Sequence, residues 1–200
     1  MCQGLHAQCY NGFAMVKIYT RHGDSGETGL LYGGRVSKTD PRCDAFGTTD
    51  EAISVLGLAR SLSNDPKVKE IIKRVQRELF TVGAELATDP SKYDTMQRNF
   101  DVISASMVEQ LERLIDELES EVALPRSFII PGASPASSAL DVARAVMRRA
   151  ERHTVFLKEA NLLVNHEVLR YLNRLADMLF MLARYEDRHL PLEALTESDA

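Results

Sequence analysis

Apolar residues recur at three- and four-residue steps over most of the chain, a spacing that predicts amphipathic helices. Asp-Pro or Ser-Pro pairs precede three of these segments, and such a pair is typical of an N-cap followed by proline at the first helical position. The pattern predicts five helices, which begin near Asp40, Asp65, Ser104, Ser134 and Leu162. The fifth is expected to end at Tyr185 and to turn Val164 inward.

Five amphipathic helices of roughly 18–25 residues favour an all-α fold, an antiparallel five-helix bundle of the ferritin-like, up-and-down type. The strand-like residues 16–19 are too few to found a sheet. Residues 1–14 show no clear period, so we expect a disordered extension there, a single domain over residues 15–187, and a polar tail over residues 188–200.

The composition narrows the functional classes. A formal net charge of −5 argues against a broad nucleic-acid interface. No apolar run approaches the ~20 residues of a membrane span. Three cysteines, at positions 2, 9 and 43, fit a reducing compartment without a disulfide framework. We therefore expect a cytoplasmic protein that binds neither nucleic acid nor membrane. A zinc site from Cys2, His6 and Cys9 matches no common ligand spacing.

A glycine-rich stretch, YTRHGDSGETGLLYGG, runs from Tyr19 to Gly34. Glycines, hydroxyls and cations together are typical of loops that hold phosphates. The stretch lacks the Gly-Lys-Ser/Thr ending of a P-loop, and no hydrophobic strand leads into it. The stretch therefore suits phosphate but does not match a P-loop.

The fourth predicted helix carries four arginines and a glutamate within nine residues. Arg144, Arg148 and Glu151 share one face, and Arg149 and Arg152 form a neighbouring stripe. Guanidinium groups match phosphate oxygens, so the cluster suits a polyphosphate. The alternative is a solvated face held by Arg–Glu pairs.

Other polar residues lie beside apolar stripes. Asn173 either bonds a ligand or faces solvent, one turn before Asp177. Asp50 and Glu51 either serve the helix dipole or join an ion pair or metal site. A di-iron bundle needs two Glu-x-x-His motifs, and the single match, at residues 186–189, is attributed to chance. The histidines at 22, 153 and 166 are expected at the surface.

The order of the motifs is more specific than any one of them. They are T-R-x-G-D-x-G-x-T (Thr20–Thr28), G-x-R-V-x-K (ending at Lys38), G-x-x-D-E (Gly47–Glu51), F-I-I-P-G (Phe128–Gly132), A-R-x-x-x-R-R-A-E-R (Ala143–Arg152) and N-R-L-x-D-x-L-F (Asn173–Phe180). This series closely resembles the PduO-type ATP:cob(I)alamin adenosyltransferases, over residues 15–185. The resemblance implies a homotrimer of five-helix bundles with active sites between subunits. It also implies transfer of the 5′-deoxyadenosyl group of ATP to the cobalt of cob(I)alamin, giving adenosylcobalamin and triphosphate.

The resemblance assigns roles to matching positions. The residues that would wrap the phosphates and Mg²⁺ are Thr20, Arg21, Gly23, Asp24, Gly26, Thr28, Gly29 and Lys38. Those that would hold ATP from the helices are Arg148, Arg149, Glu151, Arg152 and Asn173. Glu151 would reach Mg²⁺ directly or through water. Asp50 and Arg144 match a pair that bridges subunits, and Phe128 matches the aromatic that covers the lower corrin face. With Arg148, these three form the expected catalytic set.

The implied chemistry needs no protein nucleophile, because cob(I)alamin is itself one. The protein orients the substrates and offsets the charge that builds on triphosphate. A reductase and a B12-dependent acceptor enzyme are the implied partners. The open alternative is a non-catalytic carrier of ATP or corrinoid. Departures from the family pattern at Cys43, Thr49, Ala52-Ile53 and Ala176 flank the charged set and bear on corrin fit.

Overall fold

The computed structural model describes residues 19–191 and 193–195 of the chain. The expected extension over residues 1–14 lies outside them, as does most of the strand-like piece. The elements are β1 (Glu27–Gly29), β2 (Arg35–Ser37), α2 (Pro41–Leu62), α3 (Pro66–Leu86), the 3-10 turn η1 (Pro90–Lys92), α4 (Tyr93–Gln97), α5 (Ala105–Glu121), α6 (Pro135–Glu159) and α7 (Glu167–Glu186). The described chain is mostly helical.

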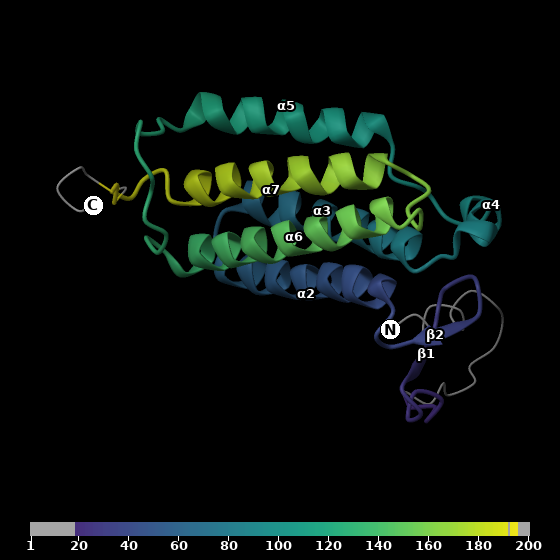
Figure 1. Cartoon of the computed structure of the whole chain (residues 1–200). Coiled ribbons are helices and arrows are strands. Elements are labelled where there is room, and N and C mark those ends of the chain that lie inside the picture. The colour runs from purple at the N-terminus through teal and green to yellow at the C-terminus, as the bar shows by residue number, and fades with distance from the viewer. Residues whose placement is uncertain (1–18, 192, 196–200) are drawn as a thin grey trace.

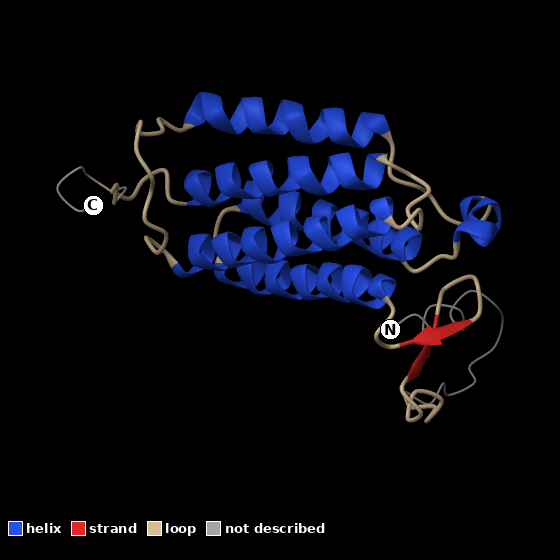
Figure 2. Cartoon of the chain, viewed as in Figure 1, coloured by secondary structure: helices blue, strands red, loops and turns tan. Residues whose placement is uncertain are grey.

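The long helices α2, α3, α5, α6 and α7 lie side by side, and each runs opposite to the one before it in the chain (Figure 1). Helix α2 packs against both α3 and α6, α6 also packs against α7, and α7 packs against α5. The strands lie beyond the end of the helices where α2 begins, whereas the loop between α5 and α6 lies at the other end (Figure 2). None of these helices has the length and apolarity of a membrane span.

Three helix starts confirm the capping prediction. The Asp40 carboxylate accepts a hydrogen bond from Arg42 N at 2.9 Å at the start of α2. Asp65 accepts from Lys67 N at 2.8 Å at the start of α3. Ser134 forms a capping box with Ser137 at the start of α6. Each cap satisfies backbone N–H groups that a helix terminus leaves without a partner.

The predicted start of the last helix was wrong by five residues. Helix α7 begins at Glu167, because the side chain of Asn165 accepts a hydrogen bond from Glu167 N at 3.0 Å and turns the chain just before it. Asn161 adopts a left-handed φ of 56° after α6. The intervening residues are not helical, so Val164 is 47% exposed instead of turned inward.

The expectation that the fold has no sheet was also wrong. Strands β1 and β2 pair antiparallel, with Glu27 opposite Ser37 and Gly29 opposite Arg35. Gly33 and Gly34 have φ of +119° and +89° in the connection. Glycine enters this region of φ without the steric cost that a side chain brings. The glycine-rich stretch is therefore a small hairpin in front of the helices.

A buried carboxylate ties the end of α3 to three later segments. Glu85 accepts hydrogen bonds from the Tyr93 hydroxyl at 2.6 Å, from Ile103 N at 2.7 Å and from Asn165 Nδ2 at 2.9 Å. Burial raises the pKa of Glu85, against the effect of these donors. The three bonds fix the chain around η1 and α4 to the start of α7.

A buried arginine and two carboxylates fix the hairpin to the helices. Arg42 is buried and donates to both oxygens of Asp40, at 2.9 and 2.8 Å. Its third bond reaches Asp89, after α3, at 3.2 Å. The hydrogen bond from Arg42 lowers the pKa of Asp40 below its ordinary 3.8. The residue that caps α2 therefore also joins the hairpin exit to α3.

Replacing Asp40 by Asn is expected to keep the cap oxygen but lose the ionic bonds to Arg42. The free energy of unfolding at neutral pH should fall by about 1–2 kcal/mol, the scale of hydrogen bonds to charged groups. Because the pKa of Asp40 is lowered in the folded state, this advantage is present above 3.8 and is lost as the pH falls through the lowered value. Urea unfolding of both proteins from pH 7 to pH 3 measures it. A difference that stays constant with pH would contradict the ionic role.

Candidate functional site

The hairpin brings Lys38 onto the glycine turn. Lys38 N donates to Gly26 O at 2.8 Å. The Lys38 ammonium lies so close to Gly23 that a Cβ at that position would be 3.2 Å from Nζ. Gly26 has φ +83°, so the turn needs a residue without a side chain there. Lys38 thus sits beside the glycines that the sequence grouped with it.

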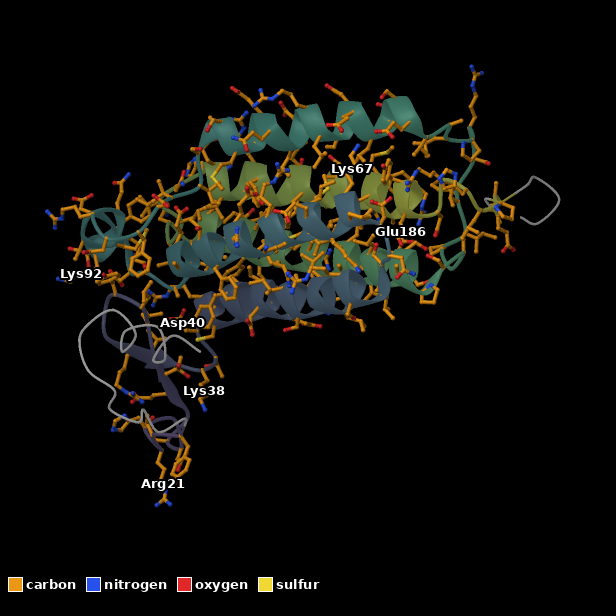
Figure 3. The ribbon with its side chains drawn as sticks, turned by 180° about the vertical axis from the view of Figure 1, so that it is seen from behind. Arg21, Lys38, Asp40, Lys67, Lys92 and Glu186 are labelled. Carbon is orange, nitrogen blue, oxygen red and sulfur yellow. The ribbon has the colours of Figure 1, made fainter. Side chains whose placement is uncertain are left out.

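The rest of the phosphate-loop set lies along the same hairpin. In Figure 3, Arg21 is at the far tip, and Lys38 and Asp40 lie nearer the helices. The Arg21 guanidinium stacks over Tyr19 at 5.7 Å. Thr20 lies just before the turn. Gly23 and Asp24 lie in the turn, and Thr28 and Gly29 lie in β1. Each of these residues is exposed or half-buried.

One face of α6 looks toward α2. Arg149 forms an ion pair with Glu51, which confirms the ion-pair interpretation of that glutamate. Beyond it, α6 and the start of α2 enclose a hollow of about 680 Å³. Its lining residues are Thr39, Pro41, Asp44, Arg149, Arg152, His153 and Phe156. The exit of the hairpin therefore meets two of the four clustered arginines.

The neighbouring face of α6 looks toward α7. Asn173 Nδ2 donates to Glu151 Oε1 at 2.8 Å, so Asn173 bonds to a residue of the same predicted set. Arg144 lies over the ring of Phe180 at 5.6 Å. Its Nε is buried, and no hydrogen-bond partner for it exists among the described residues. Arg148 is exposed, and its carbonyl accepts a hydrogen bond from Arg152 at 3.1 Å.

Asp50 lies in a different hollow. It lines an apolar space of about 230 Å³ between α2 and α3, near Phe46, Phe80 and Phe100. Within the described chain Asp50 makes no ion pair with Arg144. Asp177 pairs with Arg174 at 3.2 Å.

Phe128 is far from the hairpin. It is 83% exposed in the loop between α5 and α6. That loop and the hairpin lie at opposite ends of the helices (Figure 1). Helix α2 alone has 22 residues and spans roughly 33 Å at 1.5 Å per residue. A single chain therefore does not bring the predicted residues into one site.

Known proteins match this chain over most of its length. The family model for cobalamin adenosyltransferases matches residues 18–186. The chain belongs to this family. It is 44% identical over 170 residues to the corrinoid adenosyltransferase PduO of Citrobacter freundii, covering 85% of this chain and 50% of that protein. It is 38% identical to a second corrinoid adenosyltransferase of Citrobacter freundii, covering 86% of this chain and 96% of the relative. The chain thus spans half of the first relative and nearly all of the second.

Solved structures of the family superpose well. A variant PduO-type ATP:corrinoid adenosyltransferase from Lactobacillus reuteri, complexed with cobalamin and ATP, matches with a TM-score of 0.81 and 34% identity. The match covers 90% of this chain and 97% of that one. Another variant of the enzyme, complexed with ATP, matches with a TM-score of 0.79 and the same identity. The fold is that of the PduO-type enzymes.

Five lining residues of the larger hollow were not among the predicted site residues: Thr39 and Pro41 at the exit of the hairpin, and Asp44, His153 and Phe156 on the helices. The histidine had been assigned to an ordinary surface. Arg149, His153 and Phe156 are spaced by four and three residues, so they lie on one helix face with Arg152. That spacing could have identified the two α6 residues. No motif marked Asp44.

Gly33 anchors the hairpin to the end of α3. A Cβ at Gly33 would lie 2.3 Å from Asp89 Cβ, whereas one at Gly34 would meet nothing within 4 Å. Both residues have positive φ, and the chain beside them is held by bonds from Leu31 N to Ala87 O and from Asp89 N to Tyr32 O, each of 2.9 Å.

Replacing Gly33 by Ala is therefore expected to weaken the hairpin more than replacing Gly34 by Ala. Backbone strain at φ > 0 costs about 1–3 kcal/mol in both variants, and the clash adds to it only at Gly33. Amide hydrogen exchange of Leu31 and Asp89 reports the difference, because these N–H groups make the anchoring bonds. Equal protection in the two variants would show that Asp89 yields without cost.

Proposed function

We propose that this chain transfers the 5′-deoxyadenosyl group of ATP to the cobalt of cob(I)alamin, releasing triphosphate. The observation that carries the proposal is the hollow where the hairpin exit faces Arg149 and Arg152. A glycine hairpin with a lysine, next to a helix lined by arginines, suits a triphosphate. The Lactobacillus reuteri relatives that superpose on the chain are complexed with ATP, one of them together with cobalamin.

The reaction makes limited demands on side chains. The cobalt electron pair of cob(I)alamin attacks C5′ of ATP, a cobalt–carbon bond forms, and the C5′–oxygen bond to the triphosphate breaks. No proton must be removed from the nucleophile. The protein must align the two substrates and stabilise the growing charge on the leaving triphosphate. Lys38, Arg148, Arg149 and Arg152 are the cations we assign to that charge, with the glycine hairpin around the phosphates.

Magnesium fits this site as a partner of ATP. Among the described residues, no group of three or more His, Cys, Asp or Glu side chains could form a cage for a metal ion. Magnesium commonly binds through substrate phosphates, waters and one or two carboxylates. Glu151, oriented by its bond from Asn173, is the carboxylate we assign to it, directly or through water. Asn173 would then contact the nucleotide from the same face.

We assign the corrin to the apolar side of the site. Asp50 lines the apolar hollow with Phe46, Phe80 and Phe100, and a corrin ring offers a large apolar surface. Phe128 is a large apolar side chain with 83% exposure, so its ring is accessible to a ligand or to a second chain. A hydrophobic side chain below the corrin would exclude the lower ligand and favour four-coordinate cobalt.

We infer that the active protein is a homotrimer of five-helix, up-and-down bundles with sites between subunits. Phe128 and the hairpin lie at opposite ends of one chain, so a site that uses both draws on two copies. Arg144 has no carboxylate partner in the described chain, which leaves it available to Asp50 of a neighbour. A reductase that supplies cob(I)alamin and a B12-dependent acceptor are the proposed partners. The reducing cytoplasm is the proposed location, since cob(I)alamin requires it.

The decisive experiment mixes the protein with ATP, Mg²⁺ and chemically reduced cobalamin and follows the visible spectrum. Formation of a light-sensitive alkylcobalamin supports the transferase, whereas tight binding of both substrates without product would favour the carrier. Arg148→Ala should lower kcat/KM by about 10²–10³-fold, as losses of charge-stabilising groups do. Arg113→Ala is the control, since Arg113 is an exposed residue of α5. Unchanged kcat/KM in Arg148→Ala would reject its role.

Subunit complementation tests the shared site. Lys38→Ala and Phe128→Ala should each be nearly inactive with cob(II)alamin and a reductant, because each lacks one half of the site. If the halves come from different subunits of a closed ring, random mixed trimers restore about a quarter of the wild-type sites. The two variants are unfolded together, refolded and assayed against each variant alone. No gain of activity in mixed trimers, verified by sedimentation, would place both residues in one subunit's site.

A further inference from the structure

A short backbone pairing joins the loop that carries Phe128 to the segment that follows α7. Ile130 N donates to Glu193 O at 2.8 Å, and Leu195 N donates to Phe128 O at 2.8 Å. The two bonds flank an isolated antiparallel bridge between the segments. In Figure 1 the segment after α7 lies beside this loop, at the end of the helices away from the hairpin. The carbonyl of Phe128 is thus held by a residue 67 positions later in the chain.

The Phe128 loop has little else to hold it. Among the described residues, no other hydrogen bond involves residues 123–133. Pro125 and Pro131 have no N–H to donate, and Gly132 has φ +127°, which only glycine adopts readily. Leu124 packs partly against the core, and Ser134 caps α6. Between these two points, the pairing with residues 193–195 is what fixes the backbone.

The segment after α7 is itself anchored at its root. Arg188 forms an ion pair with Asp65 at 2.7 Å, and its guanidinium stacks on Tyr185 at 4.0 Å. Asp65 is the N-cap of α3, so the tail leaves the helices from a fixed corner. Leu190 N then donates to Asp187 O at 2.8 Å and turns the chain. A tail anchored at its root can set the position of the loop with which it pairs.

We propose that Glu193 and Leu195, through their two backbone hydrogen bonds to the loop, form a clip that positions Phe128 during the reaction. The clip rests on the proposed function, in which Phe128 covers the lower face of the corrin. Phe128 is 83% exposed, so packing within the described chain does not hold its ring in place. The backbone bond to Leu195 fixes the direction from which the ring reaches the ligand. The residues of the clip are positioning residues, because they act through Phe128.

The step that depends on the clip is the loss of the lower ligand from cob(II)alamin. Cob(I)alamin has already lost that ligand, so adenosylation of chemically reduced cob(I)alamin should need the clip much less. ATP binds at the opposite end of the contributing chain, around Lys38 and the α6 arginines, and should be indifferent to it. Loss of the clip is therefore expected to impair the reaction that starts from cob(II)alamin. ATP binding and the adenosylation of cob(I)alamin should change little.

Leu195→Pro in the full chain removes the N–H that bonds to Phe128 O. Ala194→Pro is the matched control, because Ala194 is the bridge residue and its N–H donates no bond to the loop. Leu195→Pro should lower the fraction of four-coordinate cob(II)alamin formed with ATP, measured by electron paramagnetic resonance, by about two- to tenfold, the effect of one net backbone hydrogen bond. Its KM for ATP and its rate with chemically reduced cob(I)alamin should match those of the wild type and of Ala194→Pro.

A double-variant cycle identifies the route of the effect. In a Phe128→Ala background, Leu195→Pro should cause no further loss of four-coordinate cobalt, because the residue on which the clip acts is gone. If Leu195→Pro lowers the Tm markedly, a chain that ends at Leu192 replaces it in the same assays. Wild-type levels of four-coordinate cobalt in these variants, or additive losses with Phe128→Ala, would overturn the clip. Wild-type protein that fails to adenosylate cob(I)alamin would instead overturn the proposed function.

Discussion

The packing of α2 against α6 is the contact on which the candidate site depends. It is the most extensive contact between helices in the described chain. Buried alanines recur every seven residues on both helices: Ala45, Ala52 and Ala59 on α2, and Ala136, Ala143 and Ala150 on α6. Small side chains let two helix axes approach closely, and their spacing keeps one face turned to the partner. The close approach brings the Arg149–Glu51 ion pair and the larger hollow together.

That packing also divides the charges of α6. One face of the helix packs against α2, and Arg144 and Glu151 on the neighbouring face contact α7. The position of the hairpin is also fixed, because Arg42 bonds to both Asp40 and Asp89. In addition, Gly33 packs so closely against Asp89 that a side chain would not fit there. Arg149 and Arg152 therefore face the exit of the hairpin where α2 begins, on a frame of helix ends and buried ionic bonds.

Local signals in the sequence were enough for the starts of α2, α3 and α6 and for the two faces of α6. Asp40, Asp65 and Ser134 cap their own helices, so their effect can be read within four residues. The start of α7 was missed because Asn165, and not a periodic apolar residue, ends the preceding turn. The hairpin was missed because its strands have three residues each and rely on glycine φ angles and on Asp89. Pairing between residues 128–130 and 193–195 leaves no periodic pattern, since both segments are too short to show one. The roles of the site residues came from the order of motifs, which periodicity does not contain.

The length of the helices then becomes a constraint on function. A straight helix of 22 residues separates its two ends by roughly 33 Å, and no side chain spans that gap. The hairpin with Lys38 is at one end, and the loop between α5 and α6, which carries Phe128, is at the other. The proposed reaction needs ATP held near Lys38 on one face of the corrin and Phe128 on the other, so it cannot use both ends of the same chain. Neighbouring copies that offer opposite ends to one another satisfy this geometry, and a closed ring repeats the arrangement for every copy. On this view the rigidity of the bundle is what makes the site a property of the assembly.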